Sequence, residues 1–418
     1  MKFIEKIPEL NFYVIVIFVF VRIIFVSVFA ENIVSKKFEA DALEYITTAK
    51  NISDGIGFIS NENNFKKRKY LGDNNYYSAE PSYPLYLSIF TMIGLSGKYV
   101  LLISNSLLYL ILLVYSFKIG ELLKFSRIEH YFLFLLIIFN PHLEFYSFQL
   151  IPDLFRTTIF ILLIFLILKT FRDEKKYYQK SINNTKVVIL GIASSILVLS
   201  KITFIFAPIF LSIYLLIRTK NYNQFFLHIL VSSLLLFCWS YRNFLAFEKF
   251  HIDPRFGGAG IKTTILNDEG VKNAQFMSLL RIEDNKLFNE IKLGSKMEKE
   301  NALSRYKDNI YTYIKMYLLK TYELLKPFPT GGQFSKLKFK IYSLFLYVPY
   351  FLGIFLLFYD SKILYLSINP FICVSFIIFS CMCIHVYWGS GAHARYFLPF
   401  VPLGYIYFIY HLKRYNYV

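Results

Sequence analysis

Charged residues are scarce in this chain of 418 residues: Asp, Glu, Lys and Arg make up 18% of it, against 56% hydrophobic residues. With a mean hydropathy of +0.45, this composition argues against a soluble globular domain. Cysteine is also rare. All four cysteines fall inside apolar runs, so the sequence indicates no disulfide framework.

Other signals are missing as well. Cys381, Cys383 and His385 stand at positions i, i+2 and i+4, which lie on different faces of a helix, so they predict helix packing rather than a metal site. The net charge of +18 is not arranged as a basic stripe with interleaved aromatic residues, which argues against nucleic acid as a partner. No internal repeat is visible.

What the chain has is apolar blocks of about the ~20 residues that a helix needs to cross a membrane. They cover residues 11–30, 99–117, 131–147, 154–168, 187–217, 225–243, 341–358, 364–386 and 396–411. No small-residue cleavage site follows the first block, so we expect it to remain as an anchor. Lipid offers no hydrogen bonds to the backbone, and each block should therefore be a helix. The sequence predicts an all-α polytopic membrane protein.

The distribution of basic residues suggests a topology. With a cytoplasmic N-terminus, and with 187–217 divided into two helices at Ser200 and Lys201, the chain has about ten spans. Its cytoplasmic segments then hold 16 Lys and Arg, and its short outer loops hold 2. This asymmetry agrees with the positive-inside rule. One long helix over 187–217 would put the basic ends near Arg218 and Arg414 outside.

This topology predicts three regions: an N-terminal bundle over 1–246 with a first outer loop at 31–83, an extracytoplasmic region over 247–340, and C-terminal spans over 341–418. In the first outer loop, five apolar residues share one helical face and indicate an amphipathic helix along the membrane surface. They are Ala42, Tyr45, Ile46, Ala49 and Ile52, and Gly55 and Gly57 should end the helix. Residues 81–95 are too short to span and open with two prolines, so they predict a half-helix against the bundle. We expect a second surface helix near 301–328.

Ionisable residues from distant parts of the chain fall at the outer ends of these spans, where an unpaired charge is costly. The acidic ones are Glu39, Asp41, Glu44, Glu80, Glu144 and Asp153, and the basic ones are Lys201, Arg242, His393 and Arg395. Because they share one membrane face, they predict a single polar site that faces outward.

Three motifs resemble a known superfamily. The run Asp41, Tyr45, Ala49, Asn51, Gly55, Gly57, Phe58, followed by PSYPLYL, is similar to the first outer loop of GT-C membrane glycosyltransferases, in the branch of dolichyl-phosphate-mannose protein mannosyltransferases and aminoarabinose transferases. WSYRNFLAFEKF is similar to the branch's Trp-x-x-Arg-Asn segment, and ARYFLPFVP to its Arg-Tyr-x-x-Pro segment.

The resemblance implies an inverting transfer of a sugar from a polyprenyl-phosphate donor to a glycan, lipid or protein acceptor of the cell envelope, at the periplasmic face of a bacterial inner membrane. Asp41 would be the base that takes the acceptor's proton. Arg242, Arg395 and Lys201 would bind the donor phosphate. Tyr45, Tyr83, Glu80, Asp153 and His393 would contact the substrates. The implied chemistry needs no cofactor, and a divalent cation lacks an identifiable oxygen ligand set.

Plainer roles stand beside these. Asp41 with Glu44 is typical of a capping box, and Asp153 after Pro152 is typical of a helix cap. Arg395, Arg242 and Lys201 also suit interfacial residues that extend towards water. Glu80 stands where related enzymes often carry a basic or neutral residue, so an amino sugar or a bound cation would explain it.

Two rival functions remain open at this point. A transporter or flippase of lipid-linked glycans would be expected to show paired repeats and broken midplane helices. A glycan polymerase or ligase would have the same architecture but would use a diphosphate donor.

Overall fold

The computed structural model describes residues 41–58, 80–171, 182–247, 337–363, 370–388 and 394–415, together with a few isolated positions. Every regular element in these ranges is a helix. In chain order they are α2 (Asp41–Ser53), α3 (Ser82–Met92), α4 (Gly97–Leu122), α5 (Arg127–Ile138), α6 (Pro141–Ser147), α7 (Asp153–Phe171), α8 (Asn184–Ser200), η2 (Ile202–Phe204), α9 (Phe206–Thr219), α10 (Tyr222–Phe247), α17 (Leu337–Ile363), α18 (Pro370–Trp388), η5 (Ala394–Phe400) and α19 (Val401–Tyr415). The all-α class is confirmed for this part of the chain.

Four of these helices are long and apolar enough to cross a membrane by length and composition: Tyr99–Leu122, Asp153–Phe171, Ile202–Thr219 and Tyr222–Leu245. Three shorter apolar helices accompany them, at Asn184–Ser200, Leu344–Tyr359 and Pro370–Ile384. They coincide with predicted apolar blocks, and the described part of the chain has the all-helical, apolar character of an integral membrane protein. Almost all of the first block, 11–30, and of the region 247–340 lies outside the described residues, as does the helix expected near 301–328.

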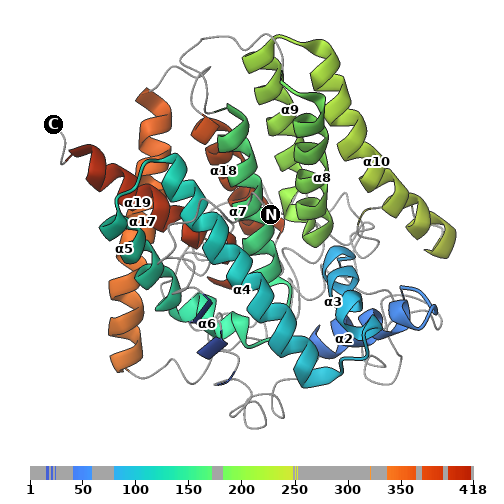
Figure 1. The fold of residues 1–418 in the computed structure, drawn as a ribbon. Coiled ribbons are helices and arrows are strands. Elements are labelled where there is room, and N and C mark those ends of the chain that lie inside the picture. The colour runs from blue at the N-terminus through green and yellow to red at the C-terminus, as the bar shows by residue number, and fades with distance from the viewer. Residues whose placement is uncertain are drawn as a thin grey trace, which may run out of the picture.

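The predicted division of 187–217 is confirmed. Helix α8 ends at Ser200, Lys201 adopts an extended conformation with φ −166° and ψ 126°, and α9 begins at Phe206. Helix α10 packs against both α8 and α9, and the three lie side by side in Figure 1. The junction at Lys201 is therefore a reversal of the chain at one end of the bundle.

The block 131–147 differs from its prediction as one continuous span. Helix α5 ends at Ile138, and a second short helix, α6, begins at Pro141. The side chain of Asn140 accepts hydrogen bonds from the backbone N–H groups of His142 and Leu143, at 3.0 and 2.9 Å. An Asn cap followed by Pro at the first helical position is a strong helix start. It interrupts the helix even though the composition stays apolar.

Helix α7 connects the two sides of the molecule (Figure 1). On one side it packs against α8, which leads to α9 and α10, and on the other it contacts α4 and η5. Helices α17 and α19 pack closely together beyond η5. The helices α2 and α3 of the first outer loop pack on each other and lie at the end of the bundle from which α7 starts. The site described below lies at this end.

Helices are present in both segments where short helices were predicted, α2 within 31–83 and α3 within 81–95. Helix α2 buries Ala42, Tyr45 and Ala49 as expected, and it also buries Thr48 and Asn51. It ends where Gly55 and Gly57 take positive φ angles of 76° and 105°, a conformation that glycine adopts without strain. Helix α3 has 11 residues, which is too short to span, in agreement with the predicted half-helix.

Helices α17 and α19 cross at two glycines. A Cβ atom added to Gly353 would lie 1.8 Å from the backbone oxygen of Gly404, and one added to Gly404 would lie 2.4 Å from the oxygen of Tyr350. Small residues permit such close approach between membrane helices, where dispersion contacts and weak hydrogen bonds supply the stability. The packing of α17 on α19 thus depends on the absence of side chains at this crossing.

We expect Gly353→Val to separate these helices. Overpacking of a tight contact costs about 1–3 kcal/mol or more, so the thermal unfolding midpoint in detergent should fall and the folded yield with it. Leu352→Ala is the matched control because Leu352 lies on the same helix and is 41% exposed. Equal midpoints for Gly353→Val and Leu352→Ala would contradict the tight crossing.

Candidate functional site

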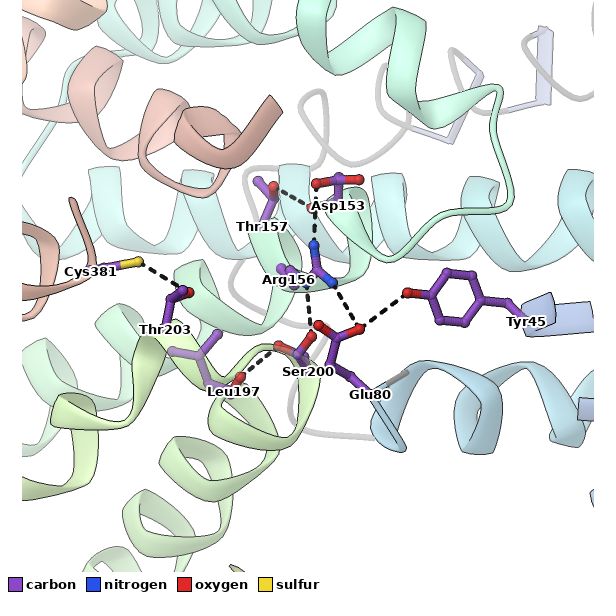
Figure 2. A network of polar contacts seen from close by, with 9 residues as sticks. All are labelled: Tyr45, Glu80, Asp153, Arg156, Thr157, Leu197, Ser200, Thr203 and Cys381. Carbon is purple, nitrogen blue, oxygen red and sulfur yellow. Dashed lines mark hydrogen bonds and ion pairs between the residues drawn. The ribbon is translucent and has the colours of Figure 1, made fainter. Parts of the chain in front are cut away.

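A buried arginine in the first turn of α7 forms the centre of the site (Figure 2). Arg156 is 5% exposed. Its Nε donates a hydrogen bond to the carbonyl oxygen of Ser200 at 2.9 Å. One terminal nitrogen lies 3.3 Å from Asp153 Oδ1, and the other lies 3.5 Å from Glu80 Oε2. All three guanidinium nitrogens therefore have acceptors, as a buried charge requires.

These acceptors come from separate parts of the chain. Asp153 is one turn before Arg156 on α7, whereas Glu80 immediately precedes Pro81 and α3. Ser200 is the last residue of α8, and its carbonyl lies among the helix-terminal carbonyls that need a partner outside the helix. The guanidinium thus joins α7, α8 and the segment before α3 at one point.

Helix α2 is attached to the same network through Tyr45. The Tyr45 hydroxyl donates a hydrogen bond to Glu80 Oε2 at 3.1 Å, and this is the oxygen that faces Arg156. The Tyr45 ring also meets the ring of Tyr83 edge to face, with centroids 5.3 Å apart. Tyr83 in turn packs against Phe155 of α7, at 5.8 Å. Burial raises the pKa of Tyr83 above its ordinary value, so its hydroxyl stays protonated.

A second cation, Lys201, lies in the turn between α8 and α9. Its ammonium nitrogen is 3.2 Å from the centroid of the Tyr396 ring of η5, a cation–π contact. Desolvation is the main cause that lowers the pKa of Lys201, to about 8; the Tyr396 side chain, Glu80 and Asp153 oppose the shift and Arg156 adds to it. Lys201 can therefore change its charge near neutral pH, which an exposed lysine does not do.

Arg242, near the end of α10, belongs to a separate group of contacts. It donates to the carbonyl oxygen of Phe58 at 2.9 Å and to Asn243 Oδ1 at 3.1 Å. Its guanidinium lies 5.1 Å from the ring of Trp239 and 5.8 Å from that of Phe58. Arg242 thus fastens the segment after α2 to the end of α10.

The structure brings together five of the nine residues selected from the sequence: Tyr45, Glu80, Tyr83, Asp153 and Lys201. Asp41 is the first residue of α2, one turn before Tyr45. Arg395 lies in η5 next to Tyr396. The side chains of Asp41 and Arg395 are outside the described part of the chain, as is the whole of His393.

The sequence analysis missed Arg156, the residue that organises the site. It falls inside the apolar block 154–168 and was treated as part of a span. Two signals were present. A charge inside an apolar helix marks a functional position by default, and Asp153 precedes it at the i, i+3 spacing of a helical ion pair.

Arg156 also supplies the cation that the acid at Glu80 requires, since the two side chains form an ion pair. Within the described residues, no three His, Cys, Asp or Glu side chains are grouped so that they could hold a metal ion.

The four cysteines are all free; Cys373 and Cys381 are buried, and Cys238 and Cys383 are exposed. The Cys381 thiol donates to Thr203 Oγ1 at 3.6 Å, beside the Lys201 turn (Figure 2).

Comparisons of the sequence and of the fold give different results. No protein-family model matches the chain, and no curated protein sequence matches it. Solved structures of the oligosaccharyltransferase of Archaeoglobus fulgidus do match its fold. The complex tethered to an acceptor peptide with the NVT sequon gives a TM-score of 0.51 at 15% identity, and covers 89% of this chain and 45% of the other. The apo form gives 0.50 at 16%, with 90% and 46% covered.

The chain thus spans less than half the length of the oligosaccharyltransferase that it matches. At this identity the similarity concerns the fold. The matched oligosaccharyltransferase is a GT-C superfamily glycosyltransferase, so the shared fold agrees with the fold that the resemblance of the three motifs implied. The branch within the superfamily stays a prediction.

The pKa of Lys201 is directly testable by competitive acetylation with mass spectrometry. We expect half-maximal reactivity near pH 8, since only the neutral amine reacts and burial disfavours the charged form. Tyr396→Leu removes the ring that stabilises the ammonium ion and should lower this midpoint further. Lys186, which is exposed at the start of α8, controls for the reagent. A midpoint for Lys201 near the ordinary ~10.4 would contradict its desolvated position.

Proposed function

We propose that the chain transfers a monosaccharide from a polyprenyl-phosphate carrier to an acceptor of the cell envelope, with inversion at the anomeric carbon. The convergence at one end of the bundle supports this most directly. Tyr45, Glu80, Asp153, Arg156, Lys201 and Tyr396 come from five separate parts of the chain and meet where α7 begins and α8 ends. The shared fold with an oligosaccharyltransferase supports glycosyl transfer as the class of reaction.

The reaction needs one carboxylate, which acts as a general base. The acceptor oxygen forms a bond to the anomeric carbon while the bond from this carbon to the phosphate oxygen breaks. The acceptor's proton passes to Asp41, and the carrier leaves as its phosphate anion without needing a proton. One general base is then enough, in contrast to the two carboxyl groups of a glycosidase.

The leaving phosphate calls for a cation that is not already neutralised. Of the cations first proposed for this role, Lys201 fits best, because it lies in the charged cluster and faces an aromatic ring instead of a carboxylate. Arg395 is next to Tyr396 in η5 and remains a candidate. Arg242 has its contacts at the Phe58 carbonyl and Asn243, so its contribution would be to hold the first outer segment in place.

The remaining roles are proposals of the same kind. Glu80, Asp153 and Tyr45 would shape the sugar site through the Arg156 network, while Tyr83 and His393 would contact the substrates. We further propose ten spans, a cytoplasmic N-terminus, and a site that faces the periplasm of a bacterial inner membrane. No cofactor is part of the proposal.

The oligosaccharyltransferase with the same fold was solved with a tethered acceptor peptide, so a protein is one acceptor to test beside lipids and glycans. The donor decides between the proposal and a polymerase or ligase. Purified protein should release undecaprenyl phosphate from an undecaprenyl-phosphate sugar. Turnover of undecaprenyl-diphosphate sugars alone would support the polymerase or ligase. If the protein turns over neither donor but moves the lipid between leaflets, the result would support a flippase.

The base is tested by Asp41→Asn. Loss of a general base should reduce kcat by ~10²-fold or more, measured as transfer of radiolabelled sugar from an undecaprenyl-phosphate donor in membranes. Asp54→Asn makes the same chemical change at an exposed position just after α2 and should leave turnover unchanged. Full turnover by Asp41→Asn would reject the assignment.

The phosphate role of Lys201 predicts a pH dependence. A phosphodiester donor keeps its negative charge, so the group that titrates near pH 8 is the lysine. Its charged form predominates at lower pH, and kcat/KM should fall about tenfold per unit above pH 8. Lys201→Arg cannot lose its charge in this range and should show lower but nearly constant kcat/KM. A falling profile in Lys201→Arg would assign the titration to another group.

A further inference from the structure

Arg156 is the residue whose contacts reach furthest through the site. We infer that it is a positioning residue that fixes α2, and with it Asp41, against the bundle through Glu80 and Tyr45; its role in transfer rests on the function proposed above. The chain of contacts is short: Arg156 faces Glu80 Oε2 at 3.5 Å, and the same oxygen accepts from the Tyr45 hydroxyl at 3.1 Å. Tyr45 is on α2, one turn after Asp41.

The charge balance around Arg156 favours positioning over binding of the donor phosphate. Its single positive charge faces two carboxylates, those of Asp153 and Glu80. The two carboxylates already balance the charge of Arg156, so the guanidinium has little attraction left for a phosphate. Its third nitrogen donates to the Ser200 carbonyl. The guanidinium is thus committed to holding segments of the protein together.

Two of the contacts that the structure describes for helix α2 lie at different points along its length. Towards its C-terminus, the Thr91 hydroxyl of α3 donates to the carbonyl of Ala49 at 3.2 Å. Nearer its N-terminus, Tyr45 contacts Glu80 and the ring of Tyr83. Positions four residues apart lie on the same side of a helix. The contact of Tyr45 with Glu80 therefore also holds the turn of α2 that begins at position 41.

This arrangement explains why two carboxylates surround one arginine. Asp153 alone, one turn away on the same helix, would hold the guanidinium within α7. Glu80 adds a link to another segment, and the Tyr45 hydroxyl extends this link to α2. A buried ion pair often adds little to the stability of a protein. Its better attested role is to favour one arrangement of the surrounding segments over others.

The decisive variant is Tyr45→Phe, because it removes the hydroxyl, keeps the ring against Tyr83 and leaves Glu80 paired with Arg156. Tyr222→Phe, at an exposed position of α10, is its matched control. Arg156→Met and Arg156→Lys test the arginine itself, and the exposed Arg127 provides the control Arg127→Met. Two quantities are measured for each protein in detergent: hydrogen–deuterium exchange of residues 41–53, and kcat and donor KM for transfer from an undecaprenyl-phosphate sugar.

Tyr45→Phe loses a hydrogen bond to a charged acceptor, so we expect faster hydrogen–deuterium exchange in α2 and a kcat lowered by about tenfold. The donor KM should stay within about twofold of the wild-type value. Arg156→Met should lower kcat by ~10²-fold, as small misplacements of reacting groups do. Arg156→Lys should recover part of this loss because it keeps the charge but not the planar fork. Tyr222→Phe and Arg127→Met should match the wild type.

Wild-type exchange in α2 and wild-type kcat in Tyr45→Phe would overturn the inference. A raised donor KM with unchanged kcat would also overturn it, since Tyr45 would then bind the donor. If Arg156→Met does not fold, Tyr45→Phe still decides. The wild-type protein could also fail to transfer sugar from any polyprenyl-phosphate donor while Tyr45→Phe still speeds exchange in α2. That result would support the attachment of α2 and would reject the proposed function.

Discussion

A guanidinium that is almost fully buried at the end of an apolar bundle is the constraint on which the rest of this site depends. Arg156 cannot lose its proton, so its charge must be matched by the protein around it. Each of its nitrogens meets an oxygen from a different place: Asp153 on its own helix, Glu80 before α3, and the last carbonyl of α8. Three segments must therefore come together for the bundle to form in this way.

The two cations of the site have different physical properties, and this suggests a division of labour. Arg156 keeps a permanent charge and a planar set of donors, which suits a fixed link between carboxylates. Lys201 has a flexible stem and a pKa lowered to about 8 by burial, and its ammonium group rests on the Tyr396 ring. The ammonium group of Lys201 can leave the Tyr396 ring to contact an anion, and its charge depends on its surroundings. These properties suit the binding and release of a substrate.

The sequence was sufficient for features that depend on local pattern. Apolar length predicted the long helices, the face of α2 followed from helical spacing, and the basic ends of 187–217 favoured the reversal at Ser200 and Lys201 that the structure contains. It was insufficient where a short signal competes with composition or where partners are distant. The Asn140 cap before Pro141 breaks an apolar block that hydropathy treats as continuous. The pair of Glu80 with Arg156 has no local signature, so the acid at position 80 had no partner until the fold brought them together.

The pairing of Glu80 also changes how the site must discriminate between its substrates. An unpaired acid beside a sugar would favour an amino sugar or require a bound cation, and the sequence raised both. Because Glu80 pairs with Arg156 and accepts from Tyr45 at the same oxygen, the charge of this carboxylate is already engaged within the protein. In the proposed transfer, selection of the sugar would then depend on other groups, such as Tyr83, His393 and the ring of Tyr396. Under the proposed function, the charge of Glu80 would maintain the shape of the site, and the selectivity for a sugar would come from the surfaces that this shape presents.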